Sequence, residues 1–359
     1  MKIYITKGSS CTDQVRVKKF IKYFDQKKIE LKFFCWLRDK SKESKYTRET
    51  FILKGGGSAN KKLLFYYPLW SVILFFKLLG EVKNNKNNII FTIDFDSAIS
   101  VYFFSFFKPK VRYIYDIHDD FALRYNFPRI IKYIIEKIDN KIKNKAFKVI
   151  HVDENRIRKR DKNYIIIYNS QEDYYTEDNL VLDNNSVFAF TGLIGKTRGA
   201  LSVYNFAKKN PKIKIIVAGR VIDSYGKKLI ELSNIEFLGY VTQDVLFEKI
   251  RNSRGIFSLY DPSNEINILA ASNKVYDAMM LGVPIIVNRG LSVEEFVVKH
   301  SLGFVVNFNF DETWSRFVDV NQDKLKKIRQ NGRHLYLNNY TYDKNIVVKM
   351  DALLDELKS

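Results

Sequence analysis

The segment ASNKVYDAMMLGVPIIV, residues 271–287, has the residue types and spacing with the clearest chemical meaning in the sequence. Ser272 or Asn273 can cap a helix that Gly282 would end, because Ser and Asn side chains accept from free amides and Gly tolerates a left-handed conformation. The first turn of such a helix presents unpaired N–H groups and partial positive charge, which suit a phosphate. Lys274 would add a full positive charge at the same place.

Asp277 lies three residues after Lys274, so both side chains project from one face of the predicted helix. A carboxylate at that position can accept hydrogen bonds from both hydroxyls of a ribose, as acidic residues do in dinucleotide-binding folds. A phosphate cradle with a ribose acceptor one turn later predicts a site for a nucleoside diphosphate. The alternative is a capped helix on which Lys274 and Asp277 pair in solvent, and the spacing alone leaves it open.

A second candidate for phosphate binding is TGLIGKTRG, residues 191–199, a glycine-rich basic turn that follows an apolar run. Gly192 would let backbone amides approach a phosphate closely. Lys196 and Arg198 could neutralise the charge that grows on a leaving diphosphate. The segment is neither GxGxxG nor a P-loop, so a plain turn between a strand and a helix is an equal alternative.

The elements that must position these residues alternate between short apolar runs and amphipathic stretches, which is typical of parallel sheets with helical crossovers. Strands are predicted at residues 3–6, 31–37, 88–94, 112–117, 148–152, 187–191, 213–218, 235–238, 255–260 and 284–287. Helices are predicted at residues 15–25, 97–107, 128–146, 199–209, 226–231, 243–250 and 274–280, with a closing amphipathic helix after residue 342.

An acidic, Asn-rich stretch at residues 169–186 separates two such series of alternating strands and helices and predicts a linker. The fold class is therefore α/β, with two Rossmann-like, doubly wound domains facing each other across a cleft. The domains are expected at residues 1–168 and 187–338. Residues 339–359 are expected to form a helix that packs back on the N-terminal domain.

The 271–287 segment resembles the S-P-N-K-x-x-E-x-M-x-x-G-x-P-V-I block of retaining family 4 glycosyltransferases with the GT-B fold. Residues 13–17, DQVRV, resemble the D-x-R-V of that family, residues 113–119, YIYDIHD, its V-Y-D-x-H-E, and residues 149–154, VIHVDE, its V-I-x-V-S-E. The matches occur in order and extend over both domains. The resemblance implies transfer of a sugar from a nucleotide-sugar to an acceptor with retention of configuration.

The same resemblance gives roles to three further residues. His118 and Asp119, in the V-Y-D-x-H-E match, would line the donor sugar as catalytic residues. Tyr240 lies in a stretch similar to the family's G-x-V turn and would pack against the base. For His118 the alternative is a core histidine, and for Tyr240 an aromatic residue at the rim of the site.

Two positions depart from the family pattern. Leu193 stands where an Arg is expected, and Lys196 or Arg220 would have to supply the missing charge. Leu269 lies eight residues before Asp277, where many members carry an acidic residue that touches the donor sugar. Glu265 and Asn267 are the nearby candidates for that contact.

The composition limits the classes of partner and cofactor that the protein can have. The 359 residues include 60 Lys and Arg against 40 Asp and Glu, a net charge of +20, which indicates an anionic partner. The two cysteines and four histidines have no metal-ligand spacing, and the DxD at residues 94–96 falls at a strand end, so no metal is expected. No cofactor is expected beyond a nucleotide-sugar donor, UDP- or GDP-linked.

Residues 63–80, LLFYYPLWSVILFFKLLG, approach the length of a membrane span, but Pro68 and Lys77 interrupt them. They predict a buried helix or an apolar face that touches a bilayer, with Trp70, Phe75 and Phe76 near basic residues. The N-terminus shows no signal-peptide pattern. We therefore expect a cytoplasmic protein, which would be peripheral on the inner membrane face if the second of these two alternatives holds.

The expected acceptor is a saccharide or lipid-linked saccharide in capsule, O-antigen or related cell-surface glycan synthesis, an expectation that rests on the family. Two rival functions stay open. A catalytically silent GT-B scaffold or subunit would explain Leu193 and Leu269. A nucleic-acid-binding protein would explain the charge, although no RNP, KH or helix-turn-helix pattern occurs and no nucleic acid is expected as a partner.

Overall fold

The computed structural model describes residues 1–359 except 46, 57–62, 126, 158–162, 176–186 and 359. The chain divides into two compact units. The N-terminal unit comprises Met1–Tyr168 and Lys349–Ser359, and the C-terminal unit comprises Asn169–Val348. Residues 169–175 of the expected linker therefore belong to the C-terminal unit, and residues 176–186 lie outside the described residues.

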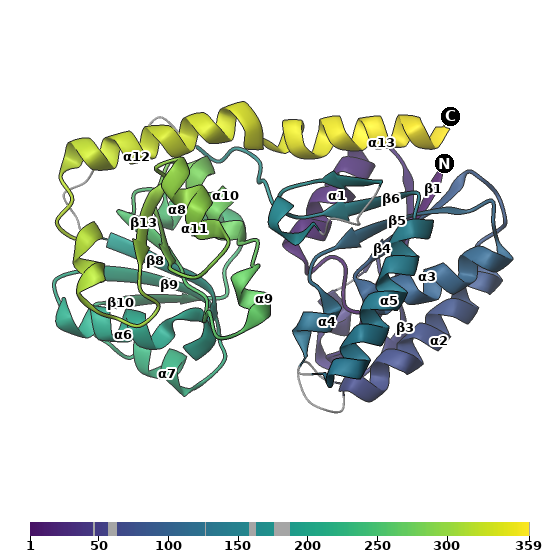
Figure 1. Cartoon of the computed structure of the whole chain (residues 1–359), viewed down its shortest axis with the longest axis horizontal. Coiled ribbons are helices and arrows are strands. Elements are labelled where there is room, and N and C mark those ends of the chain that lie inside the picture. The colour runs from purple at the N-terminus through teal and green to yellow at the C-terminus, as the bar shows by residue number, and fades with distance from the viewer. Residues whose placement is uncertain (46, 57–62, 126, 158–162, 176–186, 359) are drawn as a thin grey trace. The chain divides into compact units, whose positions relative to one another are not determined.

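The N-terminal unit is built on a parallel sheet with the strand order β3-β2-β1-β4-β5-β6-β7 (Figure 1). Its strands are β1 (Lys2–Lys7), β2 (Glu30–Leu37), β3 (Thr50–Lys54), β4 (Asn88–Ile93), β5 (Arg112–Ile117), β6 (Lys148–His151) and β7 (Tyr164–Ile166). Its helices are α1 (Val15–Gln26), α2 (Leu63–Glu81), α3 (Phe95–Phe107), α4 (Phe121–Arg124), α5 (Arg129–Lys145) and α13 (Val348–Lys358).

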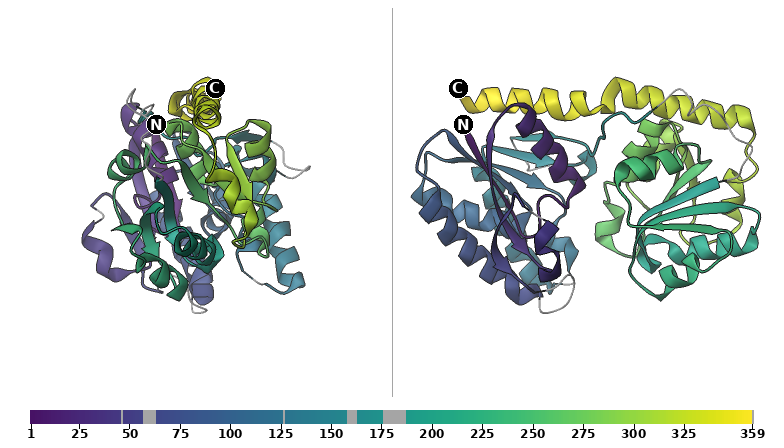
Figure 2. Two further views of the ribbon diagram at one scale, coloured as in Figure 1. Left: turned by 90° about the vertical axis from the view of Figure 1, so that its left-hand side faces the viewer. Right: turned by 180° about the vertical axis from the view of Figure 1, so that it is seen from behind.

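Helices α1 and α13 cover one face of this sheet, and α2, α3 and α5 cover the other (Figures 1 and 2). This division follows from right-handed crossovers, because the chain moves outward in one direction through α1 and in the opposite direction through α2, α3 and α5. The core beneath α2, α3 and α5 is aromatic, and Trp36, Trp70, Phe104 and Tyr115 are almost completely buried in it.

Helix α13 returns to the N-terminal unit and is held there by polar contacts. Asp351 accepts a hydrogen bond from the Tyr23 hydroxyl at 2.6 Å and pairs with Lys27 at 2.6 Å. Glu356 pairs with Lys148 at 2.8 Å. The chain thus ends on the unit in which it began, on the face that α1 covers.

The C-terminal unit has a parallel sheet with the order β10-β9-β8-β11-β12-β13. Its strands are β8 (Val187–Ile194), β9 (Lys214–Val221), β10 (Ile235–Gly239), β11 (Gly255–Ser258), β12 (Ile285–Asn288) and β13 (Gly303–Val306). Its helices are α6 (Ala200–Lys209), α7 (Ser224–Ile230), α8 (Gln243–Ile250), α9 (Glu265–Ile268), α10 (Asn273–Leu281), α11 (Val293–Lys299) and α12 (Gln322–Leu335). Helices α6 and α7 lie on one side of the sheet, and α8, α10 and α11 on the other (Figure 1).

Several elements differ from the sequence predictions. The short strands β3, β7 and β13 and the helices α11 and α12 were not predicted, and the closing helix α13 begins only at Val348. Strand β8 continues to Ile194 instead of ending at residue 191, and β9 continues to Val221. Gly192 and Arg220 therefore lie in paired strands rather than in turns.

The extension of β8 and β9 depends on two facing glycines. Gly192 pairs with Gly219, and both have positive φ angles, 99° and 135°. A Cβ on Gly219 would lie 1.9 Å from the carbonyl oxygen of Gly192, a distance that no side chain tolerates. Only glycine at residue 219 lets the two strands continue side by side to the edge of the sheet.

We expect Gly219→Ala to destabilise the protein by roughly 3 kcal/mol or more, because it adds a backbone clash to a φ that L-residues avoid. Gly239→Ala is the matched control. Gly239 also has a positive φ, 66°, but among the described residues beyond its chain neighbours no atom lies within 4 Å of where its Cβ would be. The free energy of unfolding of this control should fall by only about 1 kcal/mol. Scanning calorimetry compares the two, and equal losses would contradict the close approach of Gly192 and Gly219.

Candidate functional site

The strand orders locate the candidate site in each unit. In an open parallel sheet, ligands bind beyond the carboxyl ends of the strands where the winding reverses direction. In the C-terminal unit the reversal lies between the neighbouring strands β8 and β11. The turn after β8 and the segment from β11 to α10 therefore flank the expected binding position.

The amino end of α10 is fixed in the way the sequence predicted. Ser272 is the N-cap, and its hydroxyl accepts a hydrogen bond from the amide of Lys274 at 3.3 Å. The same hydroxyl lies 2.9 Å from that of Ser258, the last residue of β11, so the cap is tied to the sheet. Gly282 ends the helix in the left-handed conformation, with φ 63°. The first turn of α10 thus has a set position beside the strand end.

Two cations gather at this helix start. The Lys274 ammonium lies 3.5 Å from the position that a Cβ on Gly192 would occupy, so it packs against the bare backbone of β8. Lys274 and Arg198 both lie over the Tyr260 ring, with Nζ 5.6 Å and Cζ 4.4 Å from its centroid. In the part of the chain that the structure describes, neither cation pairs with a carboxylate. The arrangement leaves concentrated positive charge for an anion.

Asn267 holds Arg198 in place. Its Oδ1 accepts from Arg198 Nη1 at 2.9 Å, and its Nδ2 donates to the carbonyl of Asp261 at 3.0 Å. Asn267 is only 4% exposed, whereas Glu265, at the start of α9, is exposed. Of the two residues predicted to touch the donor sugar, Asn267 thus has the geometry of a positioning residue, and Glu265 that of a solvent-facing one.

The remaining predicted residues lie at the same edge of the C-terminal sheet. Arg220 is exposed and is the cross-strand neighbour of Leu193, so it stands beside the position where the family Arg is missing. Tyr240 follows β10 and is 83% exposed. Lys196 donates its amide to Asp223 at 2.7 Å. Asp277 is half-buried one turn after Lys274. Their roles toward a ligand stay predictions.

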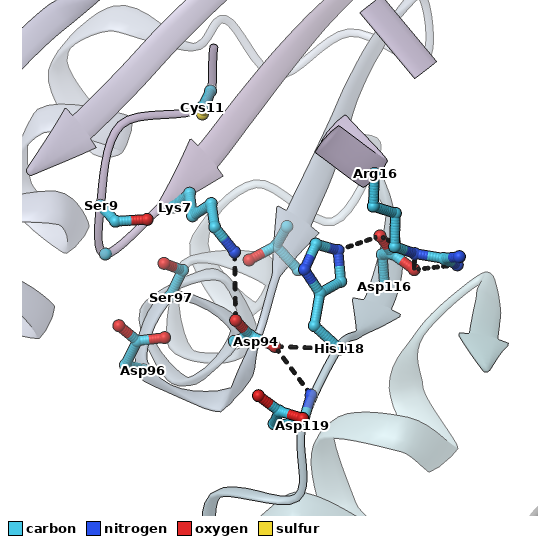
Figure 3. Close-up of polar contacts among 12 residues, drawn as sticks. Lys7, Ser9, Cys11, Arg16, Asp94, Asp96, Ser97, Asp116, His118 and Asp119 are labelled. Carbon is cyan, nitrogen blue, oxygen red and sulfur yellow. Dashed lines mark hydrogen bonds and ion pairs between the residues drawn. The ribbon is translucent and has the colours of Figure 1, made fainter. Parts of the chain in front are cut away.

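The N-terminal unit has a corresponding polar cluster, which contains the predicted residues His118 and Asp119. Its pairing of Lys7 with Asp94 was not predicted from the sequence. The cluster lies where the order reverses between β1 and β4 (Figure 3). Lys7 pairs with Asp94 at 3.1 Å, and both side chains are buried. Asp94 also accepts from the amides of His118, at 3.0 Å, and Asp119, at 3.4 Å. Burial alone would raise the pKa of Asp94, but the charges of Lys7 and His118 outweigh it and hold that pKa well below its usual range.

Asp94 is also strained, with φ 60° and ψ 162°. This region of backbone space is costly for any residue with a side chain, and such residues cluster at functional sites. The hydrogen bonds that Asp94 accepts from the two amides after β5 keep it there. Strain at the strand end therefore fixes the path of the chain at His118 and Asp119.

The His118 imidazole is oriented by a buried charge pair (Figure 3). His118 Nε2 lies 2.7 Å from Asp116 Oδ2, and Arg16 contacts both oxygens of Asp116, with Nη2 2.8 Å from Oδ1. Arg16 also donates to the carbonyl of Ile167 at 2.6 Å. Burial would raise the pKa of Asp116, but the charges of Arg16 and His118 outweigh it and lower that pKa to about 2. The side chain of His118 is 13% exposed and Nε2 contacts Asp116, so Nδ1 is the ring nitrogen that we expect to meet a substrate.

The sequence analysis included Arg16 and Asp116 only as members of the motifs at residues 13–17 and 113–119, and it predicted no role for either residue. The sequence did hold one sign of this pair, because a carboxylate inside an apolar strand must have a partner when it is buried.

Asp119 pairs with Arg124 and Arg156, each at 3.3 Å. Among the described residues, no group of three or more His, Cys, Asp and Glu side chains is placed to hold a metal ion.

Comparisons with known proteins bear on the fold and the family. Residues 193–349 match the family described as Glucosyltransferase 3-like, C-terminal domain. No curated protein matches the sequence. Among solved structures, sucrose-phosphate synthase of Thermosynechococcus elongatus is 13% identical, with a TM-score of 0.75 over 99% of both chains.

Two further solved structures resemble the whole chain. HepE of Anabaena, in complex with UDP and glucose, is 14% identical, with a TM-score of 0.72 over 99% of this chain and 100% of that one. TarM is 11% identical, with a TM-score of 0.68 over 100% of this chain and 99% of that one. At these identities the likeness shows the fold, so the expected GT-B architecture of two Rossmann-like domains is confirmed.

We expect Asp116→Asn to destabilise the N-terminal unit by about 3–5 kcal/mol, because Arg16 would remain buried without its counter-charge. The folded-state pKa of Asp116 is depressed to about 2. Its contribution is therefore present above the unfolded pKa, about 3.9, and is lost as the pH falls toward about 2. The variant should lack this acid-dependent part of the stability.

Urea unfolding followed by Trp fluorescence in a Trp314→Phe background would measure this, since Trp36 and Trp70 then report on the N-terminal unit. Asp119→Asn is the control, because the side chain of Asp119 is 38% exposed. An Asp116→Asn protein as stable as that control at neutral pH would contradict the structural role of the pair.

Proposed function

We propose that this GT-B chain, with its Glucosyltransferase 3-like C-terminal domain, transfers a hexose from a nucleoside-diphosphate sugar to a saccharide or lipid-linked saccharide, with retention of configuration. The donor binds the C-terminal unit and the acceptor the N-terminal unit. The proposed setting is cell-surface glycan synthesis, such as capsule or O-antigen, in the cytoplasm at the inner face of the membrane. The proposed reaction needs no metal.

One observation carries this proposal. Lys274 and Arg198 converge over Tyr260 at the capped start of α10, with no carboxylate partner among the described residues. Two cations and a helix amino end can hold a diphosphate and neutralise it as it leaves. This is the charge stabilisation that a metal ion supplies in other transferases, which supports a metal-independent reaction.

The carrier is proposed to be UDP. Solved structures of the similar protein HepE contain UDP and UDP-glucose, which supports uridine as the base and glucose as one candidate sugar. Asp277, one turn after Lys274, would accept from the ribose hydroxyls. Tyr240, exposed beyond β10, would pack against the base.

Catalysis is proposed to depend on charge stabilisation and orientation. As the bond between the anomeric carbon and the diphosphate breaks, negative charge grows on the leaving oxygen, and Arg198 and Lys274 stabilise it. His118, held by Asp116, would donate to or accept from a sugar hydroxyl and keep the ring oriented. The position of Arg220 beside Leu193 favours an active enzyme over a silent scaffold, because the missing charge has a neighbouring substitute.

We expect Asp277→Ala to weaken UDP binding about tenfold or more, because hydrogen bonds to a charged group contribute roughly 1.5–3 kcal/mol. His118→Ala should leave UDP affinity nearly unchanged and lower turnover about a hundredfold, as loss of one preorganised polar group does in other enzymes. Thermal shift with UDP, GDP, ADP and their sugars ranks the carriers, since a hundredfold excess over Kd stabilises by about 2.7 kcal/mol.

Glu248→Ala, at an exposed position of α8, is the matched control for the carboxylate. It should bind UDP like the wild type. UDP affinity unchanged in the Asp277 variant would refute the ribose assignment. No stabilisation by any nucleotide would refute the donor site as a whole.

A further inference from the structure

The N-terminal unit exposes a continuous apolar surface on α2, α3 and α5. On α2, Phe65, Leu69, Val72 and Phe76 are 82%, 46%, 53% and 64% exposed. Their spacing, four, three and four residues apart, puts them on one side of the helix. The opposite side of α2 carries Trp70 and enters the core, so large apolar residues lie on both the buried and the exposed side of this helix.

Helix α3 continues the exposed surface. Phe103, Phe106 and Phe107 are 51%, 56% and 63% exposed and share one side of the helix. The stripes of α2 and α3 join through Phe75, whose ring centroid lies 5.3 Å from that of Phe76 and 5.7 Å from that of Phe107. The two helices pack against each other along the same face of the sheet (Figures 1 and 2).

Helix α5 adds both apolar and basic groups. Exposed residues recur along one side of it at helical spacing, first Ile130 and Ile134 and then Lys137, Lys141 and Lys145. This stripe joins that of α3, because the Lys145 ammonium lies 3.2 Å from the centroid of the Phe106 ring. We call the exposed side chains of these stripes on α2, α3 and α5 the apolar face.

The charges around the apolar face are mainly positive. The acids of the three helices are directed to partners or are covered, since Glu81 pairs with Lys32 and Lys77, Asp139 pairs with Lys143, and Asp96 is buried. Glu136 is half-buried. The exposed lysines of α5 therefore face solvent beside the aromatic rings with little local negative charge.

A groove extends the apolar face past α2 to the edge strand β3. It has a volume of about 550 Å³ and is lined by Thr50, Phe51, Ile52, Val72, Ile73, Phe76 and Lys77. Val72 and Phe76 thus belong both to the exposed stripe and to the groove wall. The groove gives the face an apolar recess with a lysine at its rim.

We propose that the apolar face docks on an anionic lipid bilayer, with α2, α3 and α5 lying in the interface. Single exposed apolar residues are ordinary, but a joined set over three helices marks an interaction surface. Rings and aliphatic side chains beside lysines on a common helix side have the character of interfacial helices, which insert apolar groups while lysines meet anionic headgroups. The proposed contact is peripheral, and the described part of the chain contains no helix that could span a bilayer.

The docking proposal goes beyond the transfer reaction and does not depend on it. Docking would bring the N-terminal unit close to a lipid-linked acceptor, but vesicle binding can be measured without donor or acceptor. The probe is the full chain, co-sedimented with vesicles of phosphatidylcholine alone or mixed with phosphatidylglycerol. We expect binding to the mixed vesicles that weakens as salt is added, and much weaker binding to phosphatidylcholine alone.

Two pairs of substitutions test the two parts of the face. Phe76→Ser with Phe106→Ser should lower the partition coefficient at least about tenfold, because each ring contributes apolar area to insertion. Lys137→Gln with Lys141→Gln should lower it about 30-fold, from roughly a fivefold contribution of each lysine near an anionic surface.

Matched controls come from the C-terminal unit. Val245→Ser with Val298→Ser removes side chains that are 45% and 61% exposed, and Lys324→Gln with Lys327→Gln removes exposed charges on α12. Both control pairs should bind vesicles like the wild type. Wild-type protein that does not bind mixed vesicles, or loss of binding that is equal in the test and control pairs, would overturn the proposal.

Two further measurements separate the outcomes. A dimer in sedimentation equilibrium that the Phe76→Ser, Phe106→Ser pair abolishes would mean that a second copy covers the face, which also overturns bilayer docking. The thermal shift with UDP should persist in every variant of the face. Lost vesicle binding with an intact UDP shift in the test pairs supports docking, whereas vesicle binding without any UDP shift would count against the transfer function alone.

Discussion

The architecture depends on one constraint of parallel sheets. All strands of a sheet run the same way, so their carboxyl ends share an edge, and the reversal of winding keeps neighbouring loops from closing over it. In the C-terminal unit that point lies between β8 and β11, where Lys274 and Arg198 meet over Tyr260. In the N-terminal unit it lies between β1 and β4, where Lys7 meets Asp94. Residues far apart in sequence become neighbours for this reason alone.

The charged side chains at the two strand edges are neutralised in one unit and left without a carboxylate partner, among the described residues, in the other. In the N-terminal unit, Arg16 neutralises Asp116 inside the protein, and the pair fixes His118 before any substrate arrives. In the C-terminal unit, Lys274 is positioned by packing and Arg198 also by its hydrogen bond to Asn267, with no carboxylate among the described residues to neutralise them. The first arrangement is suited to orienting a group and the second to receiving an anion. This contrast supports our proposal that the diphosphate binds the C-terminal unit.

Local patterns predicted well what local physics determines. The cap at Ser272 and the left-handed end at Gly282 were readable because each depends on a few adjacent residues. The pairing of Arg16 with Asp116 spans 100 residues, and no spacing rule reaches it. The extension of β8 was missed because Gly192 looks like a turn residue until Gly219 is placed beside it. The apolar periodicity of α2 could not tell which side is buried, since both sides are apolar.

Our central proposal is that Lys274 and Arg198 at the start of α10 hold the diphosphate of the carrier. If so, the Lys274 ammonium should interact with the β-phosphate that UDP has and UMP lacks, and a thermodynamic cycle tests this most directly. Calorimetric titration of wild-type protein and Lys274→Met with UDP and UMP isolates the coupling between this side chain and the β-phosphate. We expect a coupling of about 1.5 kcal/mol or more, as for a charge-assisted hydrogen bond. A coupling near zero, with UDP and UMP losing equal affinity, would place the β-phosphate elsewhere and contradict the account.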